Sequence, residues 1–172
     1  MEQQLWDDVL YPSFFSTIRG TLYSTISQDE LDEQAFYYAR RAISAFKFPK
    51  ISTKYSVFYA TREADGSLVE VDDSDDGAIP HGMFDNELSY DEIDIIIAWM
   101  KVYWCEELIS NADSFTEIYT DSQIKTYSRA NMVDKALKML DNFRENARRL
   151  ETNYGRVSAN RTPSMGDINS DE

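Results

Sequence analysis

The chain has 172 residues, of which 42% are hydrophobic, so it suits one domain with its own core and is not a wholly disordered chain. The longest apolar run, residues 95–100, is far shorter than the roughly 20 residues of a membrane span, so we expect no membrane contact. We also expect no signal peptide, because the first four residues are neither basic nor apolar. The single cysteine, Cys105, excludes an internal disulfide.

Charge is strongly unbalanced and unevenly distributed. The chain carries 17 Lys and Arg against 31 Asp and Glu, a net charge of −14, which disfavours DNA binding over most of the surface. Residues 63–94 contain 12 acidic residues and no Lys or Arg, whereas residues 125–161 contain nine basic and four acidic residues. Such a polarised chain is suited to packing head to tail with copies of itself. The alternative is that both stretches are ordinary solvated faces.

The first half of the chain predicts two helices. Residues 5–22 are apolar enough for a helix that Pro12 kinks or restarts. Residues 27–30 (SQDE) form a capping box, which predicts that the second helix begins there. This helix has an apolar stripe at steps of three or four residues and ends before Pro49; the stripe contains Leu31, Ala35, Tyr38, Ala42 and Phe46.

A change of period follows. Residues 54–71 alternate in the manner of two strands, and Asp65-Gly66 is a typical hairpin turn. After the hairpin we expect a long acidic loop that reaches Asn86. Its carboxylates form a predicted inter-subunit acidic face, made of Asp72, Asp73, Asp75 and Asp76.

Two further helices are predicted in the second half. The box at residues 89–92 (SYDE) begins a broadly apolar helix that ends near Asn111. Another box at residues 120–123 (TDSQ) begins the last helix, which we expect to run from Ser122 to Tyr154 over roughly 50 Å. Its narrow apolar seam indicates that part of it projects or packs on another subunit; the seam consists of Ala130, Val133, Leu137, Leu140, Phe143, Ala147, Leu150 and Tyr154.

Together these elements predict a mainly α fold, a bundle of about four helices with an inserted β-hairpin. We expect the helical domain to span residues 1–154, with the hairpin and acidic loop at residues 53–88. Gly155 is a natural C-cap, so residues 155–172, which are rich in Ser, Asn and Asp, are predicted to be a flexible arm.

Catalytic chemistry has little support in the sequence. The single histidine, His81, is expected to be a surface loop residue without a catalytic task, and Cys105 a small buried residue of the third helix. The acidic loop matches the first positions of a calcium loop, but Met83 stands where a bidentate glutamate is needed. We therefore assign no catalytic residue, no metal site and no cofactor.

Binding to a partner protein is better supported. Arginine forks near the C-terminus are suited to pairing with carboxylates on a neighbouring protein. The predicted partner-binding set is Arg144, Arg148, Arg149, Tyr154, Arg156 and Arg161. Nucleic-acid binding there is disfavoured by the interleaved acids, and an ordinary solvated helix face is the other interpretation.

Five short stretches resemble the small helical head-to-tail connector proteins, also called adaptor or neck proteins, of tailed bacteriophages. The similarity extends over about residues 31–156 and rests on residues 46–49 (FKFP), 91–93 (DEI), 99–104 (WMKVYW), 127–131 (YSRAN) and 150–156 (LETNYGR). The hairpin and the acidic loop depart from the simplest helical adaptors.

The resemblance implies a structural, non-enzymatic subunit of a phage virion that is assembled in the host cytoplasm. Proteins of this family form rings of identical copies between the portal and the tail. The implied partners are therefore copies of this chain, the portal protein and neighbouring tail or neck proteins. Such rings line the DNA channel, and an acidic wall would let DNA pass without specific binding.

A second interpretation is an acidic inhibitor that imitates DNA and blocks a host nucleic-acid enzyme. The 12 acidic residues of residues 63–94 and the 11 tyrosines would suit that role. A mimic needs carboxylates spaced along a rigid surface, however, whereas most of these fall in a predicted loop and hairpin. This placement favours the structural interpretation.

Overall fold

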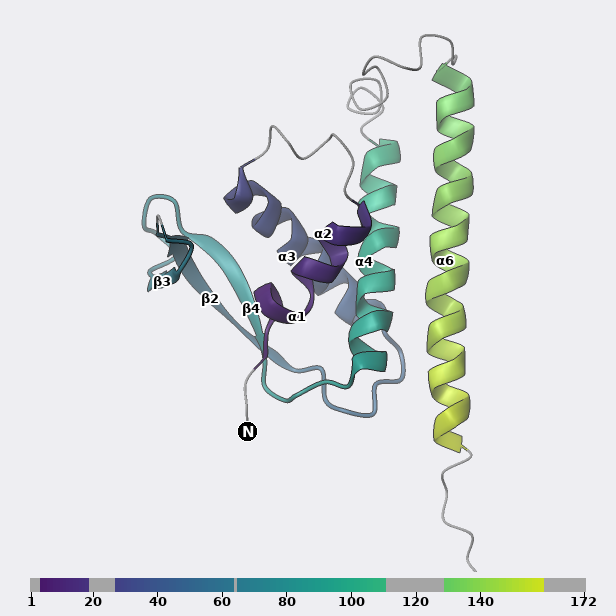
Figure 1. Cartoon of the computed structure of the whole chain (residues 1–172), viewed down its shortest axis with the longest axis horizontal. Coiled ribbons are helices and arrows are strands. Elements are labelled where there is room, and N and C mark those ends of the chain that lie inside the picture. The colour runs from purple at the N-terminus through teal and green to yellow at the C-terminus, as the bar shows by residue number, and fades with distance from the viewer. Residues whose placement is uncertain (1–3, 19–26, 64, 111–128, 160–172) are drawn as a thin grey trace, which may run out of the picture.

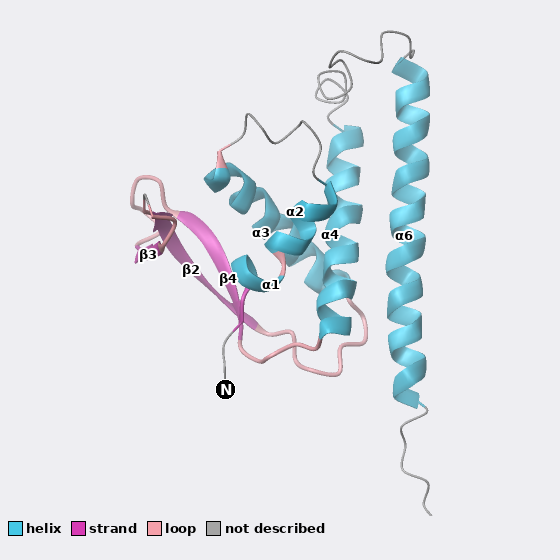
Figure 2. Cartoon of the chain, in the orientation of Figure 1, coloured by secondary structure: helices cyan, strands magenta, loops and turns pink. Residues whose placement is uncertain are grey.

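The computed structural model describes residues 4–18, 27–63, 65–110 and 129–159. Within these ranges the fold is rich in helix and contains a four-stranded antiparallel sheet (Figure 1 and Figure 2). The helices are α1 (Trp6–Val9), α2 (Tyr11–Ile18), α3 (Gln28–Ala45), α4 (Tyr90–Ser110) and α6 (Arg129–Ala159), and the strands are β1 (Gln4–Leu5), β2 (Tyr55–Arg62), β3 (Leu68–Val71) and β4 (Ile79–Phe84). The mainly α prediction therefore holds in its coarse form.

The described part of the N-terminal segment is more divided than predicted, and residues 19–22 lie outside the described residues. It contains β1, α1 and α2. Pro12 is the second residue of α2, a position in the first turn where a backbone N–H has no acceptor within the helix, so proline is tolerated. The indole of Trp6 has no exposed surface and packs against three rings, those of Phe36, Tyr55 and Phe84, at centroid distances of 5.5, 4.8 and 5.4 Å. Trp6 therefore joins the N-terminus to both α3 and the sheet.

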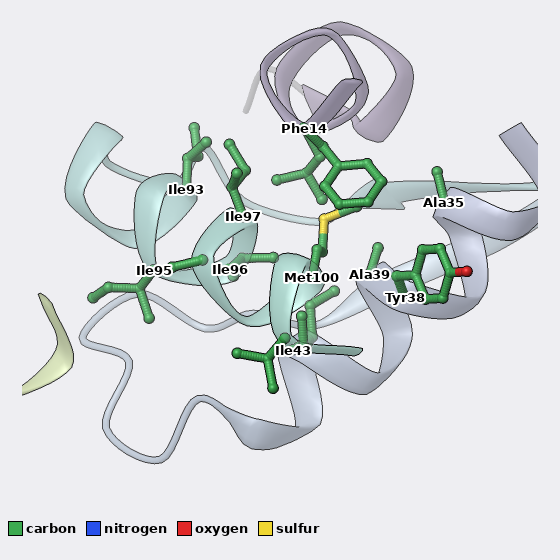
Figure 3. Packing of buried hydrophobic residues seen from close by; sticks show 14 of the residues in the cluster. Phe14, Ala35, Tyr38, Ala39, Ile43, Ile93, Ile95, Ile96, Ile97 and Met100 are labelled. Atoms are coloured by element: carbon green, nitrogen blue, oxygen red, sulfur yellow. The ribbon is translucent and has the colours of Figure 1, made fainter. Parts of the chain in front are cut away.

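Helix α3 confirms its predicted start and its predicted buried face. Ser27 is the N-cap, with a capping box between its side chain and backbone and those of Glu30. All five residues of the predicted stripe are buried. This face packs against α4, as Figure 3 shows for Ala35, Ala39 and Ile43 beside the isoleucines and Met100 of α4.

The sheet has the strand order β1-β4-β2-β3. The predicted hairpin is confirmed as β2 and β3, but the expected loop as far as Asn86 is wrong, because residues 79–84 form β4. Pro80 pairs with Tyr59 of β2, while β1 pairs only with Met83 and Phe84 of β4. At Pro80, β4 therefore has a strand partner on only one side among the described residues. Proline, which has no N–H to donate, is tolerated at such an edge position.

Residues 72–78 connect β3 to β4, and we call them the acidic loop. β3 and β4 lie on either side of β2 and both run antiparallel to it, so the loop that joins them has to cross β2. A Cβ placed on Gly77 would lie 4.0 Å from the methyl group of Thr61, which places the loop against β2. The acidic stretch is therefore short and supported by a strand.

Helix α4 lies at the centre of the molecule. It packs against α2 and α3 on one side and α6 on the other, which explains why its buried residues are not confined to one stripe (Figure 1). Phe14 of α2 lies beside Met100 in this core (Figure 3). Ile95 instead lines a separate hollow with Leu150 and Tyr154 of α6. The predicted capping box at its start is confirmed by hydrogen bonds between Ser89 and Glu92.

Helix α6 runs along α4 and covers it on the side away from the sheet (Figure 1). The seam faces α4 at Leu140, Ala147 and Tyr154, which are buried, but Leu137 is 44% exposed. The prediction that Gly155 ends the helix is wrong, because α6 continues to Ala159. The predicted box at residues 120–123 and the residues beyond 159 lie outside the described part of the chain.

Candidate interaction surfaces

The acidic loop holds its carboxylates on a hydrogen-bonded turn. The backbone N–H of Asp72 donates to Oδ2 of Asp75 at 3.1 Å, and the N–H of Asp75 donates to the carbonyl of Asp72 at 3.0 Å. The N–H of Ala78 donates to the carbonyl of Asp75, and Gly77 takes a φ of 78°, which favours glycine. All four predicted carboxylates, those of Asp72, Asp73, Asp75 and Asp76, are exposed.

The carboxylates of this loop form no ion pair within the described ranges of the chain. Between Tyr55 and Glu87 the chain has a single Lys or Arg, which is Arg62. The side chain of Arg62 is only 25% exposed, and its Nη2 lies 2.5 Å from Oδ2 of Asp32, which is almost fully buried. Arg62 also approaches Asp7 and Asp29, at 3.8 and 3.7 Å. The arginine is therefore engaged with the helices and leaves the carboxylates of the loop unpaired.

Burial governs the charge of Asp32. Desolvation raises the pKa of Asp32 more than the hydrogen bonds from Gln28 and Arg62 lower it. Its Oδ1 accepts from the Gln28 amide at 2.7 Å, so both carboxylate oxygens are hydrogen-bonded. These contacts fix α3 against the end of β2.

His81 was predicted to be a surface loop residue, and that prediction is wrong. His81 lies in β4, has no exposed surface and stacks on Phe58 with a centroid distance of 5.5 Å. Its Nδ1 lies 3.0 Å from both carboxylate oxygens of Asp7, whereas its Nε2 has no partner among the described residues. The Asp7–His81 pair joins α1 to the sheet.

The predicted partner-binding residues of α6 fall into two groups. Arg144 donates to Oε1 of Glu106 at 2.8 Å and so helps to hold α6 on α4. Arg148, Arg149 and Arg156 are exposed, and none of the three forms an ion pair within the described ranges. We call these three residues the basic face of α6. Arg161 lies outside the described residues.

Tyr154 does not belong to an exposed docking set. It is 8% exposed and its ring packs against Phe46, with centroids 5.8 Å apart. Its hydroxyl donates to Oε1 of Glu92 at 2.6 Å, and burial together with this carboxylate raises the pKa of Tyr154 to about 12. The contact between α6 and the rest of the fold, rather than a partner protein, occupies this side chain.

The two charged surfaces lie on opposite sides of the subunit. The sheet packs against α1 and α3, and α4 separates these elements from α6 (Figure 1). The acidic loop, on the sheet, and the basic face of α6 are therefore separated by the helical core. The sequence predicted the sign of each surface, and the fold supplies their separation.

Other candidate chemistry is limited in the described part of the chain. Cys105 is buried as predicted, and burial raises the pKa of its thiol to about 11. Within the described ranges, no group of three or more His, Cys, Asp and Glu side chains is arranged to hold a metal ion. No helix among the described residues combines the length and the apolar character needed to cross a membrane.

Comparisons with protein-family models, curated proteins and solved structures found no match to this chain.

Proposed function

We propose that this chain is a structural subunit of a multi-protein assembly, and specifically of the connector ring between the head and tail of a tailed bacteriophage. The observation that carries the proposal is the placement of an unpaired acidic loop and an unpaired basic helix face on opposite sides of one small subunit. A subunit that contacts copies of itself through one surface and a neighbouring ring through another needs such separate surfaces. The sequence resemblance supplies the particular assembly.

The basic face of α6 supports docking to a second protein. Arg148, Arg149 and Arg156 project from a helix that is already fixed on α4, so little conformational entropy is lost when they bind. Guanidinium groups pair bidentately with carboxylates, which makes this face suited to an acidic surface of a portal or tail protein.

The acidic loop supports a contact with another subunit. Its carboxylates have no cationic neighbour on the sheet, and such a surface repels phosphates. The hydrogen bonds within the loop keep these charges in place. The net charge of −14 separately favours a channel wall that DNA passes without binding.

Immunogold electron microscopy tests the proposal on intact particles. Antibodies against this chain would be applied to tailed phage particles from a lysate of the source culture, with pre-immune serum as the control. Gold at the junction of head and tail is the expected result. Particles that remain unlabelled after mild disruption, or that carry gold only on the capsid or the distal tail, would overturn the assignment.

The DNA-mimic interpretation has one observation in its favour, which is that the acidic loop is a hydrogen-bonded turn rather than a freely moving segment. A mimic must replace an extended row of phosphates, however, and the predicted carboxylates fall within residues 72–76. A pull-down from host lysate that retains a DNA-processing enzyme and is displaced by duplex DNA would favour the mimic over the connector.

A further inference from the structure

A third surface combines arginine and tyrosine side chains in a hollow of about 490 Å³. It lies between the second half of α3, the start of β2 and the middle of α4. We call it the arginine–tyrosine hollow, and its lining includes Tyr37, Arg40, Arg41, Ser44, Tyr55 and Tyr103. The residues come from three different elements, α3, β2 and α4.

The guanidinium groups of this hollow are held by aromatic rings. Cζ of Arg41 lies 4.1 Å from the ring centroid of Tyr103, and Cζ of Arg40 lies 5.7 Å from that of Phe36. Stacking on a ring orients a guanidinium and leaves its N–H edge for an anion. The hollow is therefore built to receive carboxylate or phosphate oxygens.

Arg40 has no carboxylate partner among the described residues. Arg41 has one, Glu106 at 3.2 Å, but Glu106 is shared with Arg144 at 2.8 Å. The missing partner must come from another molecule if these charges are to be paired.

We propose that the arginine–tyrosine hollow receives the acidic loop of a second copy of this chain. The inference rests on the proposed function, since it names the surface that the predicted inter-subunit acidic face contacts. Asp73 and Asp76 of the loop are exposed and form no ion pair with any residue that the structure describes, so the two surfaces are complementary in charge. The loop is also preordered by its own hydrogen bonds, which lowers the entropic cost of docking.

Apolar groups beside both surfaces support the same pairing. Val69 precedes the acidic loop on β3 and is 43% exposed, and Tyr37 at the rim of the hollow is 50% exposed. Contact between copies would cover both side chains, which charge pairing alone would not do. Because the loop and the hollow are different surfaces of each copy, the contact repeats from copy to copy in a chain or a ring.

The basic face of α6 is then left for a different protein. In this arrangement the hollow joins copies within a ring, and Arg148, Arg149 and Arg156 join the ring to its neighbour. The two kinds of contact can be tested separately, because the arginines of the hollow belong to α3 and those of the basic face belong to α6.

Charge reversal with mixing tests the proposal on the full chain. One variant carries Asp73→Lys and Asp76→Lys, which leaves the Asp72–Asp75 hydrogen bonds of the loop intact, and the other carries Arg40→Glu and Arg41→Glu. Self-association is measured by sedimentation velocity over a range of protein concentrations at low ionic strength. Circular dichroism melting curves establish that both variants are folded.

Wild type should associate weakly and in a salt-sensitive manner, and each variant alone should weaken association at least about tenfold, because like charges then face each other. An equimolar mixture of the two variants should restore it, since the reversed loop of one copy fits the reversed hollow of the other. The matched control, Arg148→Glu with Arg149→Glu, should associate as wild type does.

Three results would overturn the inference. These are a wild-type chain that remains monomeric at the highest concentration, a mixture that fails to restore association, and a loss of association in the α6 control instead of the hollow variant. A fourth arm uses a single-stranded DNA oligonucleotide, and binding that Arg40→Glu with Arg41→Glu abolishes would instead make the hollow a nucleic-acid site. None of these outcomes changes where gold labels the particle, so the proposed function is tested independently.

Discussion

The hydroxyl of Tyr154 on α6 donates a 2.6 Å hydrogen bond to Oε1 of Glu92, a residue in the first turn of α4 with no exposed surface. The same carboxylate accepts hydrogen bonds from the backbone of Lys50 and Ile51 and from Ser89. Glu92 therefore joins three segments, the loop after α3, the start of α4 and the end of α6. The position of the basic face depends on this network, because it fixes the helix that carries the face.

Removal of the Tyr154 hydroxyl should loosen α6. In Tyr154→Phe the ring still packs on Phe46, but Glu92 loses one donor, so we expect the free energy of unfolding to fall by about 1–3 kcal/mol. Urea denaturation measures the change. The control is Tyr90→Phe, since Tyr90 is 88% exposed, and it should leave the midpoint unchanged. Equal midpoints for the two variants would show that the hydrogen bond contributes nothing.

The charge of Glu92 should make part of the stability depend on pH. Burial alone would raise the pKa of Glu92, but hydrogen bonds from Tyr154, Ile51 and Ser89 outweigh it and lower the pKa below its ordinary value of 4.5. A carboxylate with a lowered folded-state pKa stabilises the fold above its unfolded-state pKa, and the contribution is lost as the pH falls through the folded-state pKa.

Glu92→Gln tests this dependence directly. The difference in unfolding free energy between wild type and Glu92→Gln should be constant from neutral pH to about pH 5 and should shrink below about pH 4. Urea midpoints measured across this range give the curve. A difference that stays constant into strong acid would mean that folding does not lower the pKa of Glu92.

Two glycines should respond to alanine in opposite directions. A Cβ on Gly82 would lie 2.2 Å from Cδ2 of Trp6, so Gly82→Ala forces the indole out of the core and should cost about 1–3 kcal/mol or more. Gly155 is inside α6 with open space around it, so Gly155→Ala should stabilise the protein by about 0.5–1 kcal/mol. Thermal melts of both variants measure the two effects. Melting temperatures that shift in the same direction would show that the expected effect is wrong at one of the two glycines.

The thiol of Cys105 reports on the contact between α4 and α6. Its Sγ lies 3.7 Å from the carbonyl oxygen of Ala136, and burial raises its pKa to about 11. We expect the native protein to react with a disulfide reagent such as dithionitrobenzoate at least about a hundredfold more slowly than the urea-unfolded chain, because the thiol is both covered and protonated near pH 8. Rapid labelling of native protein would mean that α6 leaves α4 readily.

The sequence predicted the elements whose signals are local. The capping boxes at Ser27 and Ser89 mark the starts of α3 and α4, and Asp65-Gly66 marks the hairpin, because each signal depends on residues close in sequence. The strand β4 was missed because Pro80 and Gly82 are typical of loops. Their fit depends on a free edge beside Pro80 and on the Trp6 indole over Gly82, which are tertiary features.

The candidate surfaces divide in the same way. The signs of the acidic loop and of α6 follow from composition. The seam that includes Tyr154 predicted an apolar contact, but part of that helix was expected to project or to pack on another subunit, and the structure buries Tyr154 against Phe46 of the same chain. The arginine–tyrosine hollow could not be predicted, because it forms only where α3, β2 and α4 meet. The Asp7–His81 pair joins residues 74 positions apart and likewise has no local signal.

Cryo-electron microscopy of the junction between head and tail of the intact particle is the most direct test of the account. We predict a ring of this chain in which the acidic loop of one copy contacts α3 of the next and the exposed arginines of α6 face a neighbouring ring. Density at the junction that accommodates no copy of this fold, or a ring whose subunits meet through other surfaces while α6 faces solvent, would contradict it.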